Sequence, residues 1–250
     1  MAFKRYLESV EMKSLLEKLE VSNLETLLEA IEHFTQKEAE KRDKILLSYF
    51  GEDGVNRIVN SICDRLLSPP KLKNNAQILD VGAGSGLFTV KIARNLHKTL
   101  PKTSFYAMDI TPAMLKLLAE KTSEIVPFLG VAENISQSVK LARKHLSVPT
   151  KFNAVYSTLM LHHCLNIETV FQSIRDVLKT RGKAVIVDLC EHSFKEFKEE
   201  MGDIHFGFKP EQIEKNVKNY FTQVSIEKLP GISCSSSGRS AELLIAYMTI

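Results

Sequence analysis

The chain has 250 residues, 44% of them hydrophobic and 25% charged, and its 33 basic and 30 acidic side chains leave a net charge of +3. This composition excludes disordered and fibrous proteins, and the near balance of charge indicates no nucleic-acid partner. No apolar run reaches the ~18 residues that cross a bilayer, and the N-terminus lacks a secretory signal. A cytoplasmic protein without a membrane partner is therefore expected. Its four cysteines form no C-x-x-C pair, so neither a metal site nor a disulfide is predicted.

Residues 1–70 are predicted to be helical, because apolar side chains recur there at helical spacing. Two capping boxes, which begin at Ser22 and Thr35, predict helix starts. Gly51 precedes a further helix, which Pro69-Pro70 ends. The segment is short for a separate domain, so its three or four helices are expected to pack on the rest of the chain, either as a lid or as a homodimer interface.

Residues 71–250 are predicted to form an α/β domain, because short apolar runs alternate there with amphipathic segments. The expected parallel strands are Gln77–Val81, Ser104–Asp109, Ile125–Val131, Phe152–Ser157 and Ala184–Leu189. Helices are expected around residues 87–98, 112–121, 135–146 and 167–179. Two last strands, Phe221–Lys228 and Ala241–Met248, are joined by a Gly/Ser-rich loop from Gly231 to Ser240, which predicts an antiparallel hairpin at the sheet edge.

The first strand leads into a glycine-rich turn, Asp80-Val81-Gly82-Ala83-Gly84-Ser85-Gly86, which opens an amphipathic helix. Glycines let a ligand approach the backbone closely, and a helix N-terminus offers unpaired N–H groups. Asp109, twenty-nine residues after Asp80, ends the second strand, where a carboxylate can accept hydrogen bonds from both hydroxyls of a ribose. The pattern predicts a site for a nucleoside-like cofactor at the carboxyl ends of the strands.

The turn differs from a nicotinamide-binding fingerprint, because Leu87 stands where G-x-G-x-x-G requires its third glycine. A carboxylate at Asp80 would also repel a pyrophosphate, whereas it suits the ammonium of an amino-acid-bearing cofactor. The run from Asp80 to Gly86, with Asp109 behind it, resembles the class I S-adenosylmethionine-dependent methyltransferase family over residues 70–250. The resemblance implies a Rossmann-like three-layer sandwich with a mostly parallel seven-stranded sheet of order 3-2-1-4-5-7-6, its last strand antiparallel.

Three further segments resemble the family. Gly130–Asn134 looks like the adenine-side segment, with Val131 where the family usually has Asp, while residues 152–163 and 183–188 look like the fourth and fifth strands. The implied cofactor is S-adenosylmethionine, with S-adenosylhomocysteine as product. The residues implied to bind it are Asp80, Gly82, Ala83, Gly84, Gly86, Asp109, Ile110, Ala132, Glu133, Asn134 and Ser157.

The acceptor side is expected beyond the fourth and fifth strands. His162 and His163 follow the fourth strand, close to where the methyl group would lie, and are candidates for a catalytic base; pocket lining or a hydrogen-bonded core role are equally open. Four other side chains are expected to line the acceptor pocket: Tyr49, Phe50, His192 and His205.

The predicted function is transfer of a methyl group from S-adenosylmethionine to a small-molecule acceptor. The helical segment 1–70 is expected to close over the cofactor and to exclude water from it. A catalytically silent cofactor-binding or interaction module is the alternative, and a nicotinamide-dependent oxidoreductase is a third. The identity of the acceptor and its attacking atom stay open.

Overall fold

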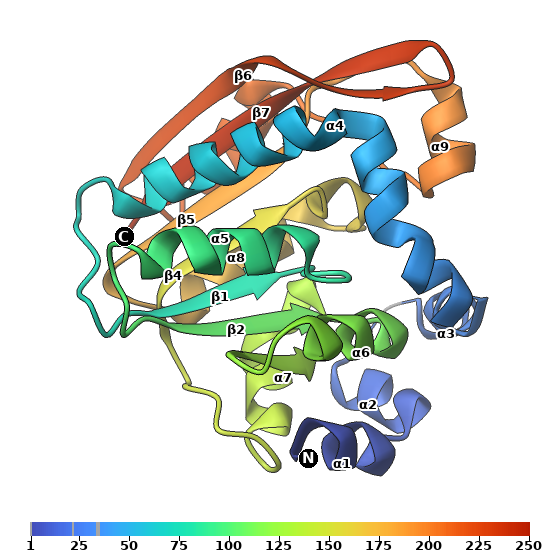
Figure 1. The fold of residues 1–250 in the computed structure, drawn as a ribbon, viewed down its shortest axis with the longest axis vertical. Helices are drawn as coiled ribbons and strands as arrows, with labels where there is room; N and C mark the ends of the chain where they lie inside the picture. The colour runs from blue at the N-terminus through green and yellow to red at the C-terminus, as the bar shows by residue number, and fades with distance from the viewer. Residues whose placement is uncertain (1, 22, 34–35) are drawn as a thin grey trace.

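The computed structural model describes residues 2–21, 23–33 and 36–250 (Figure 1). Ser22 and Thr35, the predicted starts of two helices, lie outside these described residues. A single sheet has the strand order β3-β2-β1-β4-β5-β7-β6, as predicted. Its strands are β1 (Gln77–Val81), β2 (Ser104–Asp109), β3 (Ile125–Leu129), β4 (Phe152–Thr158), β5 (Leu178–Leu189), β6 (Gln223–Ser236) and β7 (Arg239–Thr249).

The first five strands pair in parallel, and β7 runs antiparallel to both β5 and β6. In this register Val81 lies opposite Met108 of β2, and Asp80 lies opposite Tyr156 of β4. The carboxyl ends of β1, β2 and β4 therefore meet at one edge of the sheet. In open parallel sheets, ligands bind at this edge, at the point where the strand order reverses.

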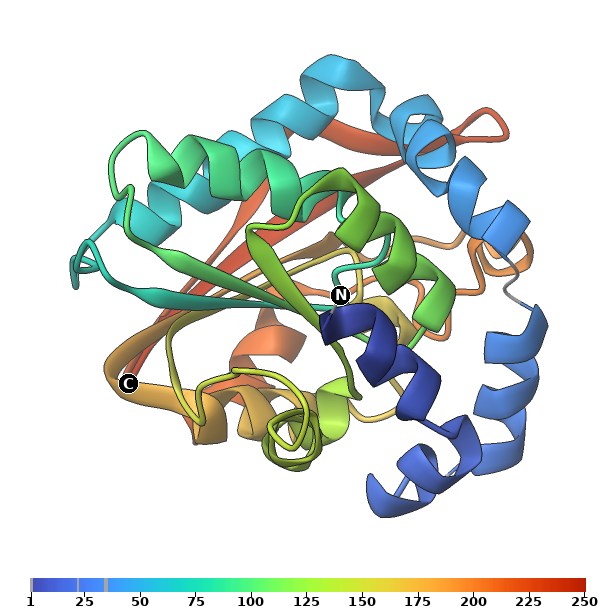
Figure 2. The same ribbon diagram turned by 60° about the horizontal axis from the view of Figure 1, so that its bottom comes forward.

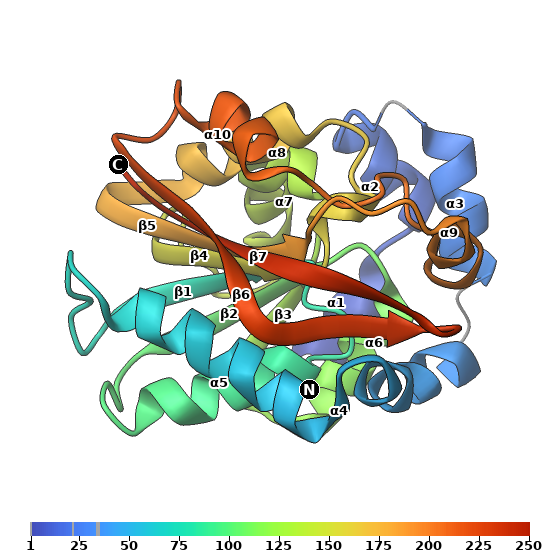
Figure 3. The same cartoon turned by 90° about the horizontal axis from the view of Figure 1, so that it is seen from above.

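Helices cover both faces of the sheet, as Figure 3 shows from above. The helices are α1 (Ala2–Ser9), α2 (Met12–Lys18), α3 (Leu24–His33), α4 (Gln36–Leu67), α5 (Leu87–His97), α6 (Pro112–Lys121), α7 (Ile135–Ala142), α8 (Ile167–Val177), α9 (Lys195–Met201) and α10 (Pro210–Val217), with short 3₁₀ turns at Ala132–Asn134 and Leu161–His163. Along β1, Ile78 packs toward α4 and α5, whereas Leu79 packs toward α7 and α8. This alternation buries both faces, as a parallel sheet requires. No helix among the described residues has the length and apolar character needed to cross a membrane.

The N-terminal helices divide between the two faces (Figures 1 and 2). Leu16 of α2 is buried in the cluster that contains β3, α7 and α8, and the Tyr6 hydroxyl of α1 accepts a hydrogen bond from Leu129 N–H of β3. Helix α4 is kinked at Gly51, whose φ is +66°, where the sequence predicted a break. After the kink, Ile58 and the residues around it pack on α5, while the first half of α4 bends toward the carboxyl edge of the sheet.

The hairpin β6–β7 is longer than the sequence predicted. The segment expected as a loop is mostly strand, since β6 continues to Ser236 and the turn is formed by Ser237 and Gly238. A register shift between Leu229 and Ser233 absorbs the Pro230-Gly231 pair as a bulge. Strand β5 likewise begins earlier, at Leu178, and helices α9 and α10 occupy a region where no element was predicted.

Candidate active site

The three glycines of the turn between β1 and α5 differ in what a side chain at each position would contact. A Cβ at Gly82 would lie 2.2 Å from Met160 Cγ, and one at Gly86 would lie 2.7 Å from Leu118 Cγ. Packing within the protein therefore explains both positions. A Cβ at Gly84 would meet no atom within 4 Å, although φ there is +54°. The open space beside Gly84 is where a ligand can approach the backbone of the turn.

Asp109 joins this turn to the end of β2. Its Oδ2 accepts a hydrogen bond from Gly84 N–H at 2.8 Å, and its Oδ1 accepts one from Thr111 N–H at 2.9 Å. Burial raises the pKa of Asp109, although both N–H groups and the nearby Arg42 oppose the shift. Each carboxylate oxygen keeps a second lone pair, so Asp109 is held rigidly and can still accept from ligand hydroxyls. Ile110, the next residue, is partly buried.

Asp80 presents an unpartnered oxygen beneath the same turn. It is 2% exposed, and its Oδ2 accepts a hydrogen bond from Thr89 Oγ1 at 2.7 Å. No donor lies within hydrogen-bond distance of Oδ1, although the buried Tyr156 hydroxyl interacts with the carboxylate. Burial raises the pKa of Asp80 to about 7. A buried carboxylate of this kind is stabilised by a cationic partner, either directly or through a water molecule.

Three of the predicted cofactor residues tie β1 to its neighbours. The N–H groups of Gly82 and Ala83 donate to the Met108 carbonyl of β2, at 2.8 and 3.0 Å. The Ser157 hydroxyl is buried and donates to the Val81 carbonyl at 2.7 Å. These bonds fix the end of β1 between β2 and β4, so the start of the turn is rigid.

The predicted adenine-side residues lie after β3. Ala132 is buried and Glu133 is partly buried, with its pKa raised by burial. Asn134 caps α7, because its side-chain oxygen accepts from Gln137 N–H at 3.3 Å, and its Nδ2 donates to the Leu19 carbonyl of the N-terminal segment. The Asn134 side chain therefore has a structural role in positioning this segment.

The first half of α4 is bound to the glycine turn through Asp43. One oxygen of Asp43 accepts a hydrogen bond from Ser85 Oγ at 2.5 Å, and the other accepts one from Lys121 Nζ at 2.6 Å. Lys121 also donates to the Ser85 carbonyl at 2.8 Å, which links α4, α6 and the turn. Arg42, the preceding residue, interacts electrostatically with Asp109 and Asp203, and burial lowers its pKa.

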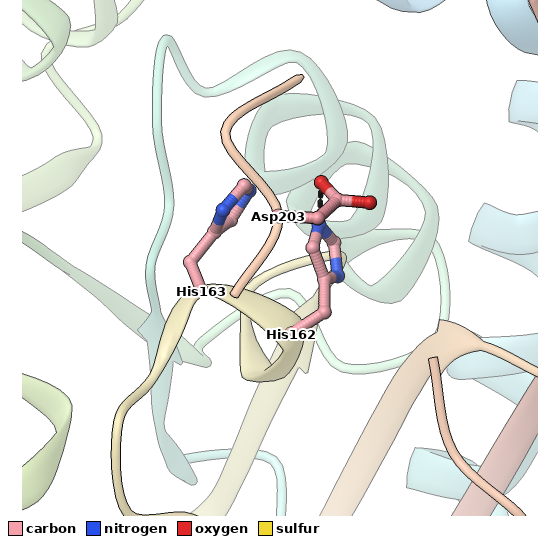
Figure 4. A group of neighbouring side chains, drawn as sticks. All are labelled: His162, His163 and Asp203. Atoms are coloured by element: carbon pink, nitrogen blue, oxygen red, sulfur yellow. Dashed lines mark ion pairs between the residues drawn. The ribbon is translucent and has the colours of Figure 1, made fainter. Parts of the chain in front are cut away.

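His162 and His163 lie at the end of β4 beside two carboxylates (Figure 4). His162 is 3% exposed; its Nδ1 is 2.6 Å from Asp188 Oδ1, and its Nε2 is 3.5 Å from Asp203 Oδ1. Burial disfavours the charged form of His162, yet the adjacent Asp188 raises its pKa above the ordinary value. Burial, with His162 next to it, lowers the pKa of His163 to about 3, so that ring is neutral at pH 7.

A cavity of about 650 Å³, wide open to solvent, lies at the surface beyond β5. Its lining residues come from two loops and the start of α10: Glu191, His192, Ser193, His205, Phe206, Gly207 and Gln212. The loops touch closely, since a Cβ at Gly207 would lie 2.2 Å from the Cys190 carbonyl oxygen. Tyr49 and Phe50 are not among the lining residues; they pack with Phe194 and Phe197 behind the cavity.

The two cavity histidines have defined hydrogen-bonding roles. His192 Nδ1 accepts from Phe194 N–H at 3.2 Å, so the proton of the neutral ring is on Nε2, which is buried without a partner. Burial lowers the pKa of His192 and keeps the ring neutral. His205 Nε2 donates to the Cys164 carbonyl at 2.9 Å, which leaves Nδ1 able to accept a proton.

Residues 79–184 match the family model described as a methyltransferase domain. EEF1A lysine methyltransferase 2 of Mus musculus is 26% identical over 167 residues, which cover 60% of this chain and 63% of that protein. Malonyl-[acyl-carrier protein] O-methyltransferase of Magnetococcus marinus is 23% identical over 141 residues, which cover 56% of this chain and 48% of that protein. The chain thus spans less than two thirds of the length of these curated relatives.

Solved structures share the fold. Phosphoethanolamine N-methyltransferase 2 of Haemonchus contortus, in complex with S-adenosyl-L-methionine, matches with a TM-score of 0.61 at 15% identity, over 86% of this chain and 57% of that chain. The chain therefore has the fold of these methyltransferases, and residues 79–184 are similar to a methyltransferase domain. S-Adenosyl-L-methionine is the ligand of that solved structure, and this chain offers groups that fit it. The space beside Gly84 admits a ligand, Asp109 can accept from ribose hydroxyls, and the orphaned Asp80 Oδ1 can accept from an ammonium.

Several residues of the candidate site were not predicted from the sequence. Asp188 ends a buried strand in the same way as Asp80, and that signal could have identified it. Arg42, Asp43 and Asp203 have no local signal, because only the packing of α4 and of the loop after α9 brings them to the strand ends.

Replacing Asp80 by Asn is expected to remove a pH dependence of cofactor binding. Near its pKa of about 7 the Asp80 carboxyl is half protonated, and a bound ammonium favours the ionised form. Affinity for S-adenosylmethionine should therefore rise about tenfold between pH 6 and 8, following the ionised fraction. In Asp80→Asn the affinity should be weaker and flat over this range, measured by isothermal titration calorimetry. An equal rise in the variant would assign the pH dependence to another group.

Proposed function

We propose that this protein is an S-adenosylmethionine-dependent methyltransferase, which transfers the methyl group to a small-molecule acceptor in the cavity beyond β5. The observation that carries this proposal is the position and size of the cavity. Its loops follow β5 at the carboxyl edge of the sheet, where Asp80 and Asp109 also lie, and about 650 Å³ is the scale of a small-molecule site. His192 lines the cavity as a neutral histidine, and its Nε2–H is buried without a hydrogen-bond partner.

S-Adenosylmethionine supplies an electrophilic methyl group when it is bound. The chain itself has to align an acceptor lone pair with that group and exclude water, since proximity and desolvation provide much of the acceleration. We assign proton removal, where the acceptor requires it, to Nδ1 of His205, which lines the cavity. His162 is enclosed by Asp188 and Asp203, and its carbonyl accepts from the N–H groups of Ile204 and His205 at 3.0 Å. Its contribution would be to position the loop that carries His205.

The relatives act on different classes of acceptor by their names, so the acceptor class needs a direct test. The protein is incubated with S-adenosylmethionine labelled in the methyl group and with an extract of its own cells, divided by size into metabolites and macromolecules. Label in the metabolite fraction supports the proposal, whereas label in the protein or nucleic-acid fraction assigns another acceptor. If neither fraction is labelled above a Gly84→Val control while cofactor still binds, the chain is a silent cofactor-binding module.

We infer that the first half of α4 acts as a lid over the cofactor, and Asp43 tests this. Asp43→Ala removes the acceptor for Ser85 and Lys121, so affinity for S-adenosylmethionine should fall about five- to tenfold. Hydrogen exchange should also become faster in residues 36–50. Glu52→Ala is the matched control: Glu52 lies on the same helix beyond the kink, and its pair with Lys91 at 3.4 Å is exposed. Equal affinities for wild type and Asp43→Ala would make α4 a purely structural element.

A further inference from the structure

We infer that His162, His163 and Asp203 form a binding site for a divalent transition-metal ion such as Zn²⁺. Each of the three residues offers one ligand atom, and the three atoms lie within 4.8 Å of one another (Figure 4). Imidazole and carboxylate ligands bind such an ion at 2.0–2.2 Å. Small rotations of the three side chains would bring their ligand atoms to these distances from a shared metal position. The inference does not depend on the proposed methyl transfer, because metal binding is measured directly.

Asp203 is the observation that points to a ligand. It is 1% exposed, and neither of its carboxylate oxygens has a hydrogen-bond partner. Buried carboxylates in proteins are paired, hydrogen-bonded or bound to metal. His162 Nε2 lies 3.5 Å from Asp203 Oδ1, which is too long for a good hydrogen bond. Asp203 is thus a buried carboxyl group 3.5 Å from a ring nitrogen; burial raises its pKa, and a cation beside it would favour its ionised form.

Asp188 orients His162 as metal sites orient their histidines. The Nδ1–H of His162 is held by Asp188 Oδ1 at 2.6 Å, and Asp188 is fixed in turn by the N–H groups of Leu161 and Leu189, each at 2.8 Å. A histidine ligand in a metal site ordinarily donates its other ring N–H to a carboxylate in this way, which fixes the tautomer. The neutral ring then presents the Nε2 lone pair toward Asp203, and a cation between these two electron-rich groups would stabilise both.

The charges around the cluster favour the binding of a cation. Arg42 is the cation that interacts with Asp203, His162 and His163, whereas Asp188 and Asp203 contribute two carboxylates. With neutral histidines and both carboxylates ionised, the cluster has one negative charge in excess even if Arg42 is counted with it, and Arg42 also interacts with Asp109. Two imidazoles with one carboxylate favour Zn²⁺ or Fe²⁺ over Mg²⁺ or Ca²⁺, which prefer oxygen ligands. Three protein ligands would also leave a coordination position open for a small ligand.

The competing explanation is a proton on His162, which would pair the ring with both carboxylates. To distinguish the two, the full-length protein is treated with a chelator, dialysed, and titrated with Zn²⁺ by calorimetry and with Co²⁺ by visible absorption. One equivalent per chain is expected, with d–d bands and no thiolate charge-transfer band, because the cluster contains no cysteine. Zn²⁺ should also raise the thermal unfolding temperature of the wild type.

Variants assign the ion to these residues. Asp203→Asn and His163→Gln should each weaken Zn²⁺ binding at least tenfold, and Asp188→Asn about 10- to 100-fold through His162. His145→Gln, which removes an exposed histidine elsewhere, should bind as the wild type does. His163 is only partly buried, so its variant keeps the test decisive if Asp203→Asn fails to fold. Failure of the wild type to bind Zn²⁺, or unchanged binding in His163→Gln, would overturn the inference in favour of a protonated His162.

Discussion

A Gly84→Val variant is expected to keep its fold and to lose affinity for S-adenosylmethionine by at least about a hundredfold, or ~2.7 kcal/mol. A Cβ at Gly84 would meet no protein atom within 4 Å, so a valine there disturbs no packing and instead fills the space beside the turn. Its φ of +54° makes the variant less stable by roughly 1–2 kcal/mol. Calorimetric titration measures the loss, and thermal unfolding shows that the variant is folded.

Gly238→Val is the matched control for backbone strain. Gly238 has a φ of +72° and, like Gly84, open space around its Cβ position, but it lies in the β6–β7 turn. Strands β4, β5 and β7 separate that hairpin edge from β1. The control should be destabilised by a similar amount and should bind cofactor normally. Near-wild-type affinity in Gly84→Val would mean that the turn is structural and that the cofactor binds elsewhere.

Asp109→Ala is expected to weaken S-adenosylmethionine binding by about 1.5–3 kcal/mol, which is roughly ten- to hundredfold. The variant loses the acceptor of the ribose hydroxyls, and it also frees the N–H groups of Gly84 and Thr111 that Asp109 holds. Its effect therefore combines a lost ligand contact with a less rigid turn. Asp109→Asn retains one acceptor oxygen and should have a smaller effect.

A ligand lacking the ribose hydroxyls separates these two contributions. Binding of S-adenosylhomocysteine and of its 2′,3′-dideoxy analogue is compared in the wild type and in Asp109→Ala, as in a double-mutant cycle. The wild type should discriminate between the two ligands about tenfold or more, and the variant should not discriminate between them. Equal discrimination in both proteins would assign the ribose to a different acid.

The parallel strands and the glycine turn were predictable because their signals are local, whereas the order of the strands followed from the family resemblance. Alternation of apolar runs with amphipathic segments identifies a parallel sheet. The run from Asp80 to Gly86 specifies a tight turn that few other sequences can form. Local signals were weaker at the edge of the sheet. Strand β6 is partly exposed along most of its length, so its Ser- and Gly-containing second half has no apolar pattern, and only pairing with β7 identifies it as strand.

The roles of individual residues depended on contacts between distant segments. All three turn glycines look alike in the sequence, yet Met160 and Leu118 account for two of them and leave Gly84 facing open space. Helical periodicity predicted the helices of residues 1–70, but it does not specify that α1 and α2 pack on one face of the sheet and the second half of α4 on the other. Periodicity describes a single helix, whereas the face of the sheet that the helix covers depends on the shape of the surface it packs against.

The cluster at the end of β4 was decided by the tertiary structure alone. His162 is adjacent to Asp188 because β4 and β5 are neighbours in the sheet, and Asp203 reaches it through the loop after α9. The sequence by itself determined the α/β fold, the glycine turn after β1 and the acid at the end of β2, since each depends on a short run of residues. Burial removes water from charged groups, so their stability depends on the partners that they find inside the protein. Which charges are buried together is known only from the folded structure.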